Sequence, residues 1–313
     1  MTFDLQAARR ALLAADSVVP HTDADGLAAG AIALRARGET AARAVLLGRG
    51  ETPFGDDAPL RAGSVAVLDW GVRPLARPGL LVDHHAPETD PRADQLVVSG
   101  YAEHPEISTA VLLRRLVPDA PAWLAAIGAF GDLGDAAFSL PECVPAPRGA
   151  VRTVVPLVNA ARRVPDGPVR EALALLVEHD ELGTALRDPR IGLLTRAREE
   201  WQAAFRTALR TAPVVSREAA LVRFASAYQV HPLVATAWSR RLAPRVVLAA
   251  NDGYVPERVN FSLRGGAGDL RVLLRRALPE AGGDFAHGHD RATGGSLPPA
   301  QFDELVRRLG IAL

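Results

Sequence analysis

The chain has 313 residues, enough for two domains that each bury a core of their own. Its 36 basic and 36 acidic residues cancel, which excludes the strongly basic class of proteins that bind long duplex nucleic acid. The single cysteine, Cys143, excludes an internal disulfide framework and a cysteine-based zinc site. No stretch has the apolar length of a membrane span, and the N-terminus lacks a signal-peptide pattern, so we expect a cytoplasmic protein without a membrane partner.

The first part of the chain alternates short apolar runs with helical patterns, after an opening helix over residues 4–15. Apolar runs of strand length predict strands at 17–20, 44–47, 64–68, 80–83 and 95–98. Helical spacing predicts helices at 27–37, 106–116 and 121–129. Strands that alternate with helices predict an α/β domain built on a parallel sheet with helical crossovers.

Residues 148–208 are mainly helical in pattern, and a second α/β pattern follows them. It comprises strands at 219–225, 245–250 and 258–263, helices at 231–242, 269–277 and 299–309, and a glycine- and histidine-rich loop at 282–295. We therefore expect three parts: a first domain over residues 1–190, a helical connector over 191–212 and a smaller α/β domain over 213–313.

Acidic and imidazole side chains gather where the predicted strands and helices begin or end. They are His21, Asp23, Asp25, Asp69, Asp83, His84, His85, Asp132 and Asp135. The carboxyl ends of parallel strands meet at one edge of a sheet, so these groups could share one crevice. Four carboxylates there would repel one another unless divalent cations bound them. Oxygen and nitrogen ligands without sulfur suit a hard or borderline metal, and two ions would use the whole set.

Each acid also has a purely structural explanation. Asp25 could cap the helix that follows it, Asp69 could end a strand, and Asp132 could lie in a glycine-flanked turn. The spacing of Asp23 and Asp25 favours a shared ligand pair, because alternate residues of an extended chain point to the same side. The conjunction of several such positions therefore predicts a two-metal site that acts on a phosphorus centre.

The C-terminal part offers groups that suit an anion. Arg264 presents a bidentate fork, which matches a phosphate. Glycines between Gly282 and Gly295 let backbone N–H groups approach an anion closely, and His289 adds a donor. A surface loop beside a sheet arginine is the alternative explanation of the same residues.

Four ordered motifs between Val18 and Asp135 resemble those of the DHH phosphoesterase superfamily, which includes RecJ-type exonucleases, nanoRNases and cyclic-dinucleotide phosphodiesterases. They are His21-Thr22-Asp23-Ala24-Asp25-Gly26, Val67-Leu68-Asp69-Trp70-Gly71, Asp83-His84-His85 and Ile127-Gly128-Ala129-Phe130-Gly131-Asp132. Two C-terminal segments, 258–264 and 288–295, resemble the substrate-binding strand and glycine-rich histidine loop of a DHHA1 domain. The resemblance implies an N-terminal DHH domain that binds metal and a C-terminal DHHA1 domain that binds substrate.

The resemblance also implies roles for single residues. The implied metal ligands are Asp23, Asp25, Asp69, His84 and Asp132, to which we add His21. Many relatives place a ligand histidine four residues before the first aspartate, a position that Val19 occupies here. Asp83 is expected to orient a ligand, and His85 to contact the phosphate and stabilise charge or protonate the leaving group. The expected substrate-binding residues are Ser262, Arg264, His289, Gly294 and Gly295, with His287 close to His289 in the sequence.

The expected activity is hydrolysis of short oligonucleotides or single-stranded nucleic acid to mononucleotides, with two divalent ions (Mn²⁺, or Mg²⁺) and an attacking hydroxide. Alternatives are a RecJ-like exonuclease on longer single-stranded DNA, a small-nucleotide phosphatase, a cyclic-dinucleotide phosphodiesterase and a catalytically impaired nucleotide sensor. Cleavage polarity, the choice between RNA and DNA, and a homodimeric state remain open.

Overall fold

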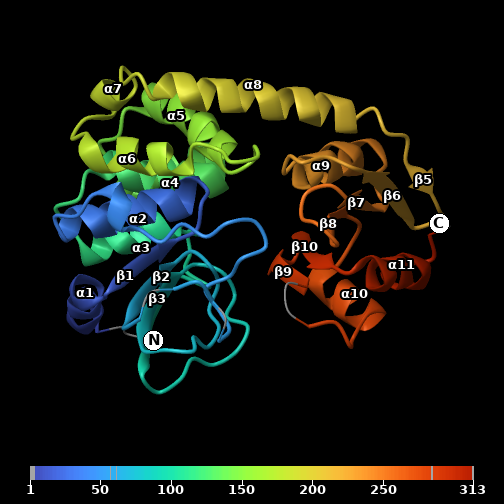
Figure 1. Cartoon of the computed structure of the whole chain (residues 1–313), viewed down its shortest axis with the longest axis horizontal. Helices are drawn as coiled ribbons and strands as arrows, with labels where there is room; N and C mark the ends of the chain where they lie inside the picture. Colours follow the sequence, from blue (N-terminus) through green and yellow to red (C-terminus); the bar gives the residue numbers. More distant parts are fainter. Residues whose placement is uncertain (1–3, 57, 61, 283–284, 312–313) are drawn as a thin grey trace. The chain divides into compact units, whose positions relative to one another are not determined.

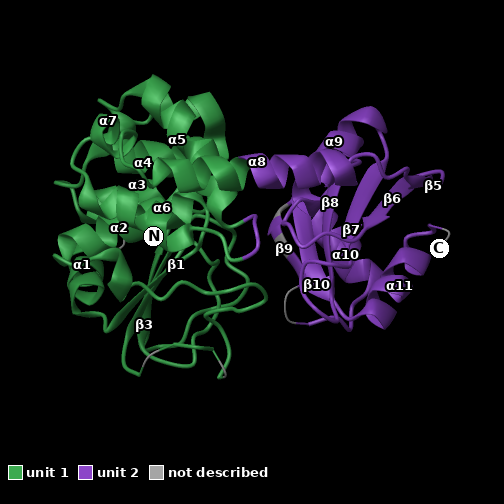
Figure 2. Cartoon of the chain, turned by 45° about the horizontal axis from the view of Figure 1, so that its top comes forward, with its two compact units in different colours: residues 1–162, 166–198 green, residues 163–165, 199–313 purple. Residues whose placement is uncertain are grey.

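The structure, a computed structural model, describes residues 4–56, 58–60, 62–282 and 285–311 (Figure 1). The side chains of His287 and His289 lie outside this description. The chain forms two compact units (Figure 2). Unit 1 comprises residues 1–162 and 166–198, and unit 2 comprises residues 163–165 and 199–313. The helix α8 (Ile191–Ala208) lies within the predicted connector and spans the boundary between the units.

Unit 1 is built on a parallel sheet of four strands in the order β1-β2-β3-β4. The strands are β1 (Ser17–Pro20), β2 (Val65–Leu68), β3 (Gly79–Asp83) and β4 (Gln95–Ser99). Every residue of β1 and β2 is buried, as expected for parallel strands that are covered on both faces. Pro20 pairs with Leu68, and Leu68 with Val82, so the carboxyl ends of three strands are in register at one edge.

Helices cover one face of this sheet and loops cover the other. The helices of unit 1 are α1 (Leu5–Ala14), α2 (Ala24–Ala36), α3 (Thr109–Leu116), α4 (Ala122–Leu133), α5 (Arg148–Ala161), α6 (Val169–Glu178) and α7 (Leu182–Ala185). Short 3₁₀ turns lie at Ala41–Arg43, Gly134–Ser139 and Pro141–Cys143. The helical core includes Val18, Leu68 and Val82 of the sheet, whereas Val19 and Val67 face a smaller core with Leu47.

The predicted strand over residues 44–47 is wrong, because the segment makes only a single bridge from Ala44 to Val18. Its apolar character has another cause, since Leu47 packs into the loop-side core beneath the sheet. An apolar run indicates that a segment is buried, but it does not show that the segment pairs with another strand. The β1–β2 connection contains α2, whereas the β2–β3 and β3–β4 connections are loops.

Unit 2 is a sheet of six strands in the order β5-β6-β7-β8-β10-β9, in which β6 and β7 are parallel and the other pairs antiparallel. The strands are β5 (Val214–Val215), β6 (Ala219–Phe224), β7 (Val246–Asn251), β8 (Val259–Gly265), β9 (Phe285–His289) and β10 (Ala292–Leu297). The core of α9 (His231–Arg241) includes Val222 and Val247. The core of α10 (Leu270–Ala277) and α11 (Pro299–Arg308) includes Phe261 and Leu263.

The predicted loop over residues 282–295 is also wrong, because most of it forms the β9–β10 hairpin. Glycine and histidine have low strand propensity, so the composition indicates a loop. The neighbouring strand overrides this propensity, since β10 pairs with β8 along its whole length, from Ala292 opposite Arg264 to Leu297 opposite Val259. Among the described helices, none combines the length and the apolar character that crossing a bilayer requires.

Candidate metal centre

The six side chains predicted as metal ligands lie together at the carboxyl edge of the unit 1 sheet. His21 follows β1, Asp69 follows β2 and His84 follows β3. Asp23 and Asp25 lie at the start of α2, and Asp132 lies near the end of α4. Three groups of the described side chains could each hold a metal ion: His21 with Asp23 and Asp69, Asp25 with His84 and Asp132, and Asp69 with His84 and His85. Asp135 is not among them and pairs at the surface with Arg152.

In the first group, the His21 ring faces two carboxylates. His21 Nδ1 lies 2.8 Å from Asp23 Oδ2 and 3.6 Å from Asp69 Oδ2. The Nδ1 atom is buried, yet it has no hydrogen-bond geometry to either partner. The ring packs edge-on against Trp70, with the ring centroids 5.0 Å apart. A ring nitrogen that approaches two carboxylates without a hydrogen bond fits a ligand of a shared cation.

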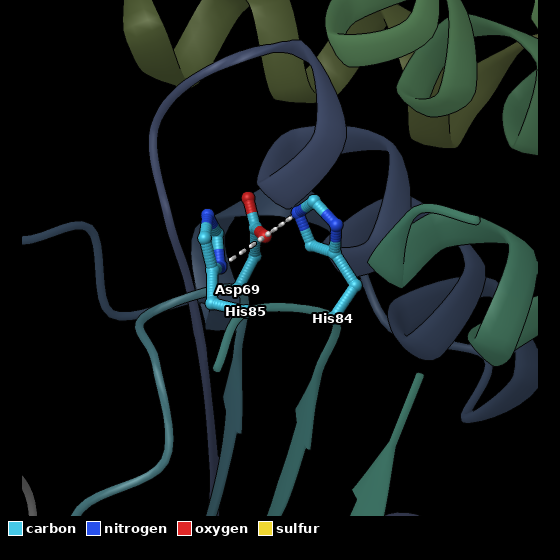
Figure 3. A group of neighbouring side chains, drawn as sticks. All are labelled: Asp69, His84 and His85. Atoms are coloured by element: carbon cyan, nitrogen blue, oxygen red, sulfur yellow. Dashed lines mark ion pairs between the residues drawn. The ribbon is translucent and has the colours of Figure 1, made fainter. Parts of the chain in front are cut away.

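In the second group, His84 Nε2 is surrounded by three carboxylates. It lies 3.4 Å from Asp132 Oδ2, 3.5 Å from Asp69 Oδ1 and 3.8 Å from Asp25 Oδ2. Ligands bound at about 2.0–2.2 Å to one ion lie about 3.0–3.6 Å from one another, so the two shorter separations fit a common ion. Figure 3 shows the His84 and His85 rings on either side of the Asp69 carboxylate. Asp69 Oδ2 faces His21 of the first group, and Asp69 Oδ1 faces His84 of the second. Asp69 therefore lies between the two groups, as a bridging ligand would.

The N-terminus of α3 holds Asp25 and Asp69 in place, which the sequence did not predict. The backbone N–H groups of Thr109 and Ala110 donate to Asp25 Oδ2 and Oδ1 at 2.8 and 2.9 Å. The Thr109 hydroxyl donates to Asp69 Oδ1 at 3.0 Å. Asp25 therefore does not cap its own helix, a role that Asp23 fills by accepting from the Gly26 N–H at 3.1 Å. The only sequence signal for these contacts was the Ser108-Thr109 pair at the start of a helix. The aspartates that it contacts are distant in the sequence, so the pairing could not be predicted.

Asp83 and His85 lie next to this cluster and are joined to each other. Asp83 Oδ2 accepts from the Gly71 N–H, and Asp83 Oδ1 from the His85 N–H, both at 2.6 Å. Asp83 Oδ1 also lies 3.0 Å from His85 Nδ1, while that nitrogen is 3.8 Å from Asp69 Oδ1. Both oxygens of the buried Asp83 are thus occupied by neighbouring loops, so Asp83 fixes the His85 ring in place.

Burial and the neighbouring charges shift the pKa values of the side chains in this cluster. Burial and the Asp69 carboxylate raise the pKa of Asp25 to about 7. Burial and the Asp25 carboxylate raise the pKa of Asp132 well above its usual value, although 33% of its side chain remains exposed. Burial disfavours the charged ring of His84, but the Asp69 carboxylate outweighs it and raises the pKa of His84 to about 11. Burial also opposes the charge on Asp69, but the His21 and His84 rings outweigh it and lower the pKa of Asp69. The raised pKa values of Asp25, Asp132 and His84 mean that a divalent cation competes with protons for these three groups, whereas Asp69 is already ionised.

The positively charged side chain of Arg162 contacts the first group. Arg162, at the end of α5, places Nη1 3.1 Å from Asp23 Oδ2, the same oxygen that faces His21. One turn earlier, Asn159 Oδ1 accepts from the Ala24 N–H at 2.9 Å and anchors the start of α2. Neither residue was predicted from the sequence, because an isolated arginine or asparagine in a helix carries no recognisable pattern.

In unit 2, four of the predicted substrate-binding residues lie on paired strands. Ser262 of β8 faces Gly294 of β10, with Arg264 and Gly295 at neighbouring positions. Arg264 Nη1 donates to Ser262 Oγ at 2.6 Å, and also to the carbonyl oxygens of Leu263 and Thr293 at 2.9 and 3.1 Å. His289 ends β9, and its side chain lies outside the described residues.

No carboxylate partner of Arg264 is found within the described part of the chain. Burial lowers the pKa of Arg264 to about 10, because the charge loses water without gaining a counter-ion. A half-buried guanidinium that is held only by neutral acceptors is suited to a bound anion such as phosphate.

Comparison with known proteins gives structural matches only, since no protein-family model and no curated protein matches the chain. RecJ exonuclease bound to manganese is 21% identical, with a TM-score of 0.63, and the match covers 99% of this chain and 94% of that chain. RecJ from Thermus thermophilus in complex with Mn²⁺ is 20% identical, with a TM-score of 0.70. That match covers 99% of this chain but only 54% of the longer RecJ.

The pGpG-specific phosphodiesterase PggH from Vibrio cholerae is 13% identical, with a TM-score of 0.50, and the match covers 94% of this chain and 97% of that chain. At these identities the likeness concerns the fold, and it extends over both units. The chain has the fold of RecJ and of other DHH-domain proteins, as its four ordered motifs predicted.

Proposed function

We propose that the chain is a phosphodiesterase that depends on divalent metal ions and hydrolyses short oligonucleotides to mononucleotides. One observation carries this proposal: two groups of acid and imidazole ligands meet at one sheet edge with Asp69 between them. His21 and Asp23 would hold one ion, Asp25, His84 and Asp132 the other, and Asp69 both. The ligand set of oxygen and nitrogen suits Mn²⁺ or Mg²⁺, and the RecJ structures contain Mn²⁺. When bound, such a pair supplies a hydroxide nucleophile and neutralises phosphate charge.

His85 would act on the phosphate from beside the metal ligands. Burial disfavours its charged ring, but the hydrogen bond to Asp83 outweighs burial and raises the pKa of His85 to about 9. His85 therefore carries a proton at neutral pH, and Asp83 keeps its Nδ1 side occupied. The protonated ring can donate to a phosphate oxygen or to the departing oxygen.

Unit 2 would bind the substrate through Arg264 and Ser262. Among the described residues, the guanidinium of Arg264 donates only to neutral acceptors, so a phosphate would supply its missing counter-ion. Gly294 lies opposite Ser262, where an added Cβ would lie 2.3 Å from the Phe261 carbonyl oxygen, so strand pairing alone already requires this glycine.

The likeness to PggH, a phosphodiesterase named for the dinucleotide pGpG, supports a short substrate. The likeness to RecJ supports a second candidate, an exonuclease on longer single-stranded DNA. The two differ in how the rate depends on substrate length. A short-oligonucleotide hydrolase acts fastest on its shortest substrates, whereas a processive exonuclease acts at least as fast on long strands.

The test is a time course with Mn²⁺ on labelled substrates from dinucleotides to long single strands, as RNA and as DNA, labelled at each end in turn. We expect mononucleotides from the short substrates, and the order of labelled products gives the cleavage polarity. Tight binding without any product would show a nucleotide sensor and would overturn the proposed activity. Loss of activity in His84→Ala, with an unchanged circular dichroism spectrum, would place the reaction at the metal centre.

A further inference from the structure

One face of the unit 2 sheet changes from apolar to polar between β7 and β8. Directly paired residues of neighbouring strands lie on the same face. On this face, Ala249 and Val247 of β7 belong to the core beneath α9. Their partners on β8 are Ser262 and Arg264, which are polar. The polar part of the face therefore begins at β8, beside an apolar core, and already contains the residues proposed to bind phosphate.

Asn260 lies on the same face, two residues before Ser262, and its side-chain Oδ1 accepts no hydrogen bond from the described residues. Its exposed fraction is 8%, and its Oδ1 atom is buried without a donor. A buried amide without partners is unfavourable, so a native protein that keeps one calls for a reason.

Asn251, which lies directly across from Asn260 on β7, differs from it because its side-chain amide is hydrogen-bonded through both its oxygen and its nitrogen. Asn251 Oδ1 accepts from the backbone N–H groups of Ser226 and Gly253 at 2.8 and 3.1 Å, and its Nδ2 donates to the Tyr228 carbonyl at 3.0 Å. Asn251 thus has a structural role in fixing two loops. Asn260 has no such role, although both belong to one pair of strands.

The hydroxyl on the other side of Asn260 is engaged elsewhere. Ser296 of β10 pairs directly with Asn260, but its Oγ accepts from Arg258 Nε at 2.7 Å. Arg258 also donates through Nη2 to the Ser296 carbonyl oxygen. Asn260 Oδ1 accepts from neither of these paired residues and has no donor among the described residues.

We propose that Asn260 reads the sugar of the bound nucleotide: its Oδ1 accepts a hydrogen bond from the ribose 2′-hydroxyl of the nucleotide whose phosphate lies at Arg264 and Ser262. The inference rests on the proposed function for the phosphate site. Residues two apart in a strand are separated by about 7 Å, which is close to the distance between the phosphate and the 2′-hydroxyl of one nucleotide. The 2′-hydroxyl is the group that lets a protein distinguish RNA from DNA. The chain is then a ribonucleotide-preferring member of its fold.

The test is calorimetric titration of the metal-free full chain with 5′-AMP and with 5′-dAMP, which differ only in the 2′-hydroxyl. One hydrogen bond corresponds to an affinity about 2- to 10-fold higher for 5′-AMP than for 5′-dAMP. In Asn260→Ala we expect the affinity for 5′-AMP to fall to that for 5′-dAMP, which itself stays unchanged. Asn260→Asp retains an acceptor, so its ratio of the two affinities should stay above one even if both affinities fall.

Two controls locate the effect. Ser296→Ala removes the hydroxyl across from Asn260 and should keep the wild-type ratio, whereas Arg264→Ala should weaken binding of both nucleotides. The melting temperature of Asn260→Ala should not fall, because no hydrogen bond is lost. Equal wild-type affinities, or an equal loss for both nucleotides in Asn260→Ala, would overturn the inference. Metal-dependent hydrolysis of bis(p-nitrophenyl) phosphate, which has no sugar, tests the proposed function separately from the sugar contact.

Discussion

In the proposed metal centre, His21 would complete the half that contains Asp23. Its ring is fixed between the two carboxylates that it faces and the edge of Trp70. Val19, four residues before Asp23, is fully buried in the core on the loop side of the sheet, so its position does not face the candidate ligands. The histidine that faces them is His21, two residues before Asp23.

Replacing His21 should remove one of two bound ions. We expect equilibrium dialysis against Mn²⁺ to give two ions per chain in the wild type and one in His21→Ala, because His84 and its carboxylates remain intact. The exposed His104 provides a control, and His104→Ala should keep both ions. Two tightly bound ions in His21→Ala would remove His21 from the ligand set.

Metal binding should release protons and strengthen as the pH rises. The pKa of His84 is raised to about 11 and that of Asp25 to about 7, so without metal His84 holds a proton at neutral pH and Asp25 is partly protonated. A metal ion must displace these protons, and each step up in pH lowers that cost. Calorimetry of Mn²⁺ binding in two buffers of different ionisation enthalpy measures the protons released. An affinity that is independent of pH between 6 and 8 would contradict this account.

Arg162 should weaken metal binding at the first group, because its guanidinium already neutralises Asp23. We expect Arg162→Ala to bind Mn²⁺ about 2- to 10-fold more tightly, a change typical of removing one nearby like charge. The matched control is Arg152→Ala on the same helix, whose partner Asp135 is exposed and belongs to none of the three candidate metal groups. Weaker binding in Arg162→Ala would mean that the arginine positions Asp23 for the metal.

At the residue scale, the sequence predicts the ligands but not the residues that support them. His21, Asp69 and His84 follow buried strands, and strand ends can be recognised from apolar runs. Thr109 and Arg162 contact their aspartates across 84 and 139 residues of chain, and no local pattern records such contacts.

At the scale of elements, the close packing of α2 and α4 sets the position of Asp25. Gly128 of α4 faces this carboxylate, and a Cβ there would lie 2.3 Å from Asp25 Oδ1 and 2.4 Å from the Ala110 Cβ. Residues 24–34 of α2 are all buried, and many of them are alanine or glycine, which lets neighbouring helices approach closely. The helices thus bring Asp25 near Asp132 only because small residues line their contact.

Adding one methyl group at this contact should damage both stability and metal binding. We expect Gly128→Ala to lose about 1–3 kcal/mol of unfolding free energy by overpacking, and to bind Mn²⁺ more weakly because Asp25 is displaced. Gly149 of α5 has open space around it, so Gly149→Ala should instead gain about 0.5–1 kcal/mol. Urea denaturation measures both. Similar effects of the two substitutions would show that Gly128 is not a tight contact.

Elements with strong periodicity were predictable, and those defined by their partner were not. The helices of both units follow their apolar spacing, as in α10 and α11. The hairpin β9–β10 was not predictable, because its glycine- and histidine-rich residues form strands only through pairing: β10 pairs with β8, and β9 pairs with β10. Conversely, residues 44–47 have strand-like side chains but lack a complete partner strand.

At the scale of the whole molecule, the charge is divided between the two units. Unit 1 gathers Asp23, Asp25, Asp69 and Asp132 at one sheet edge, whereas unit 2 keeps Arg264 without a carboxylate among the described residues. The net charge of zero conceals this division, so the composition alone gave no indication of the proposed phosphate site. The motifs did give this indication, because they specify which charged residues lie at which strand ends.

The most direct test of the central claim is the release of mononucleotide from a labelled dinucleotide by the wild type and by Asp69→Asn, with Mn²⁺ and with excess chelator. Asp69 lies between both candidate groups and would be their shared ligand, and the amide keeps its size while removing its charge. We predict product only from the wild type with Mn²⁺, with the rate at least about 100-fold lower in Asp69→Asn. Equal product from Asp69→Asn, or from the wild type in chelator, would contradict a metal-dependent reaction at this centre.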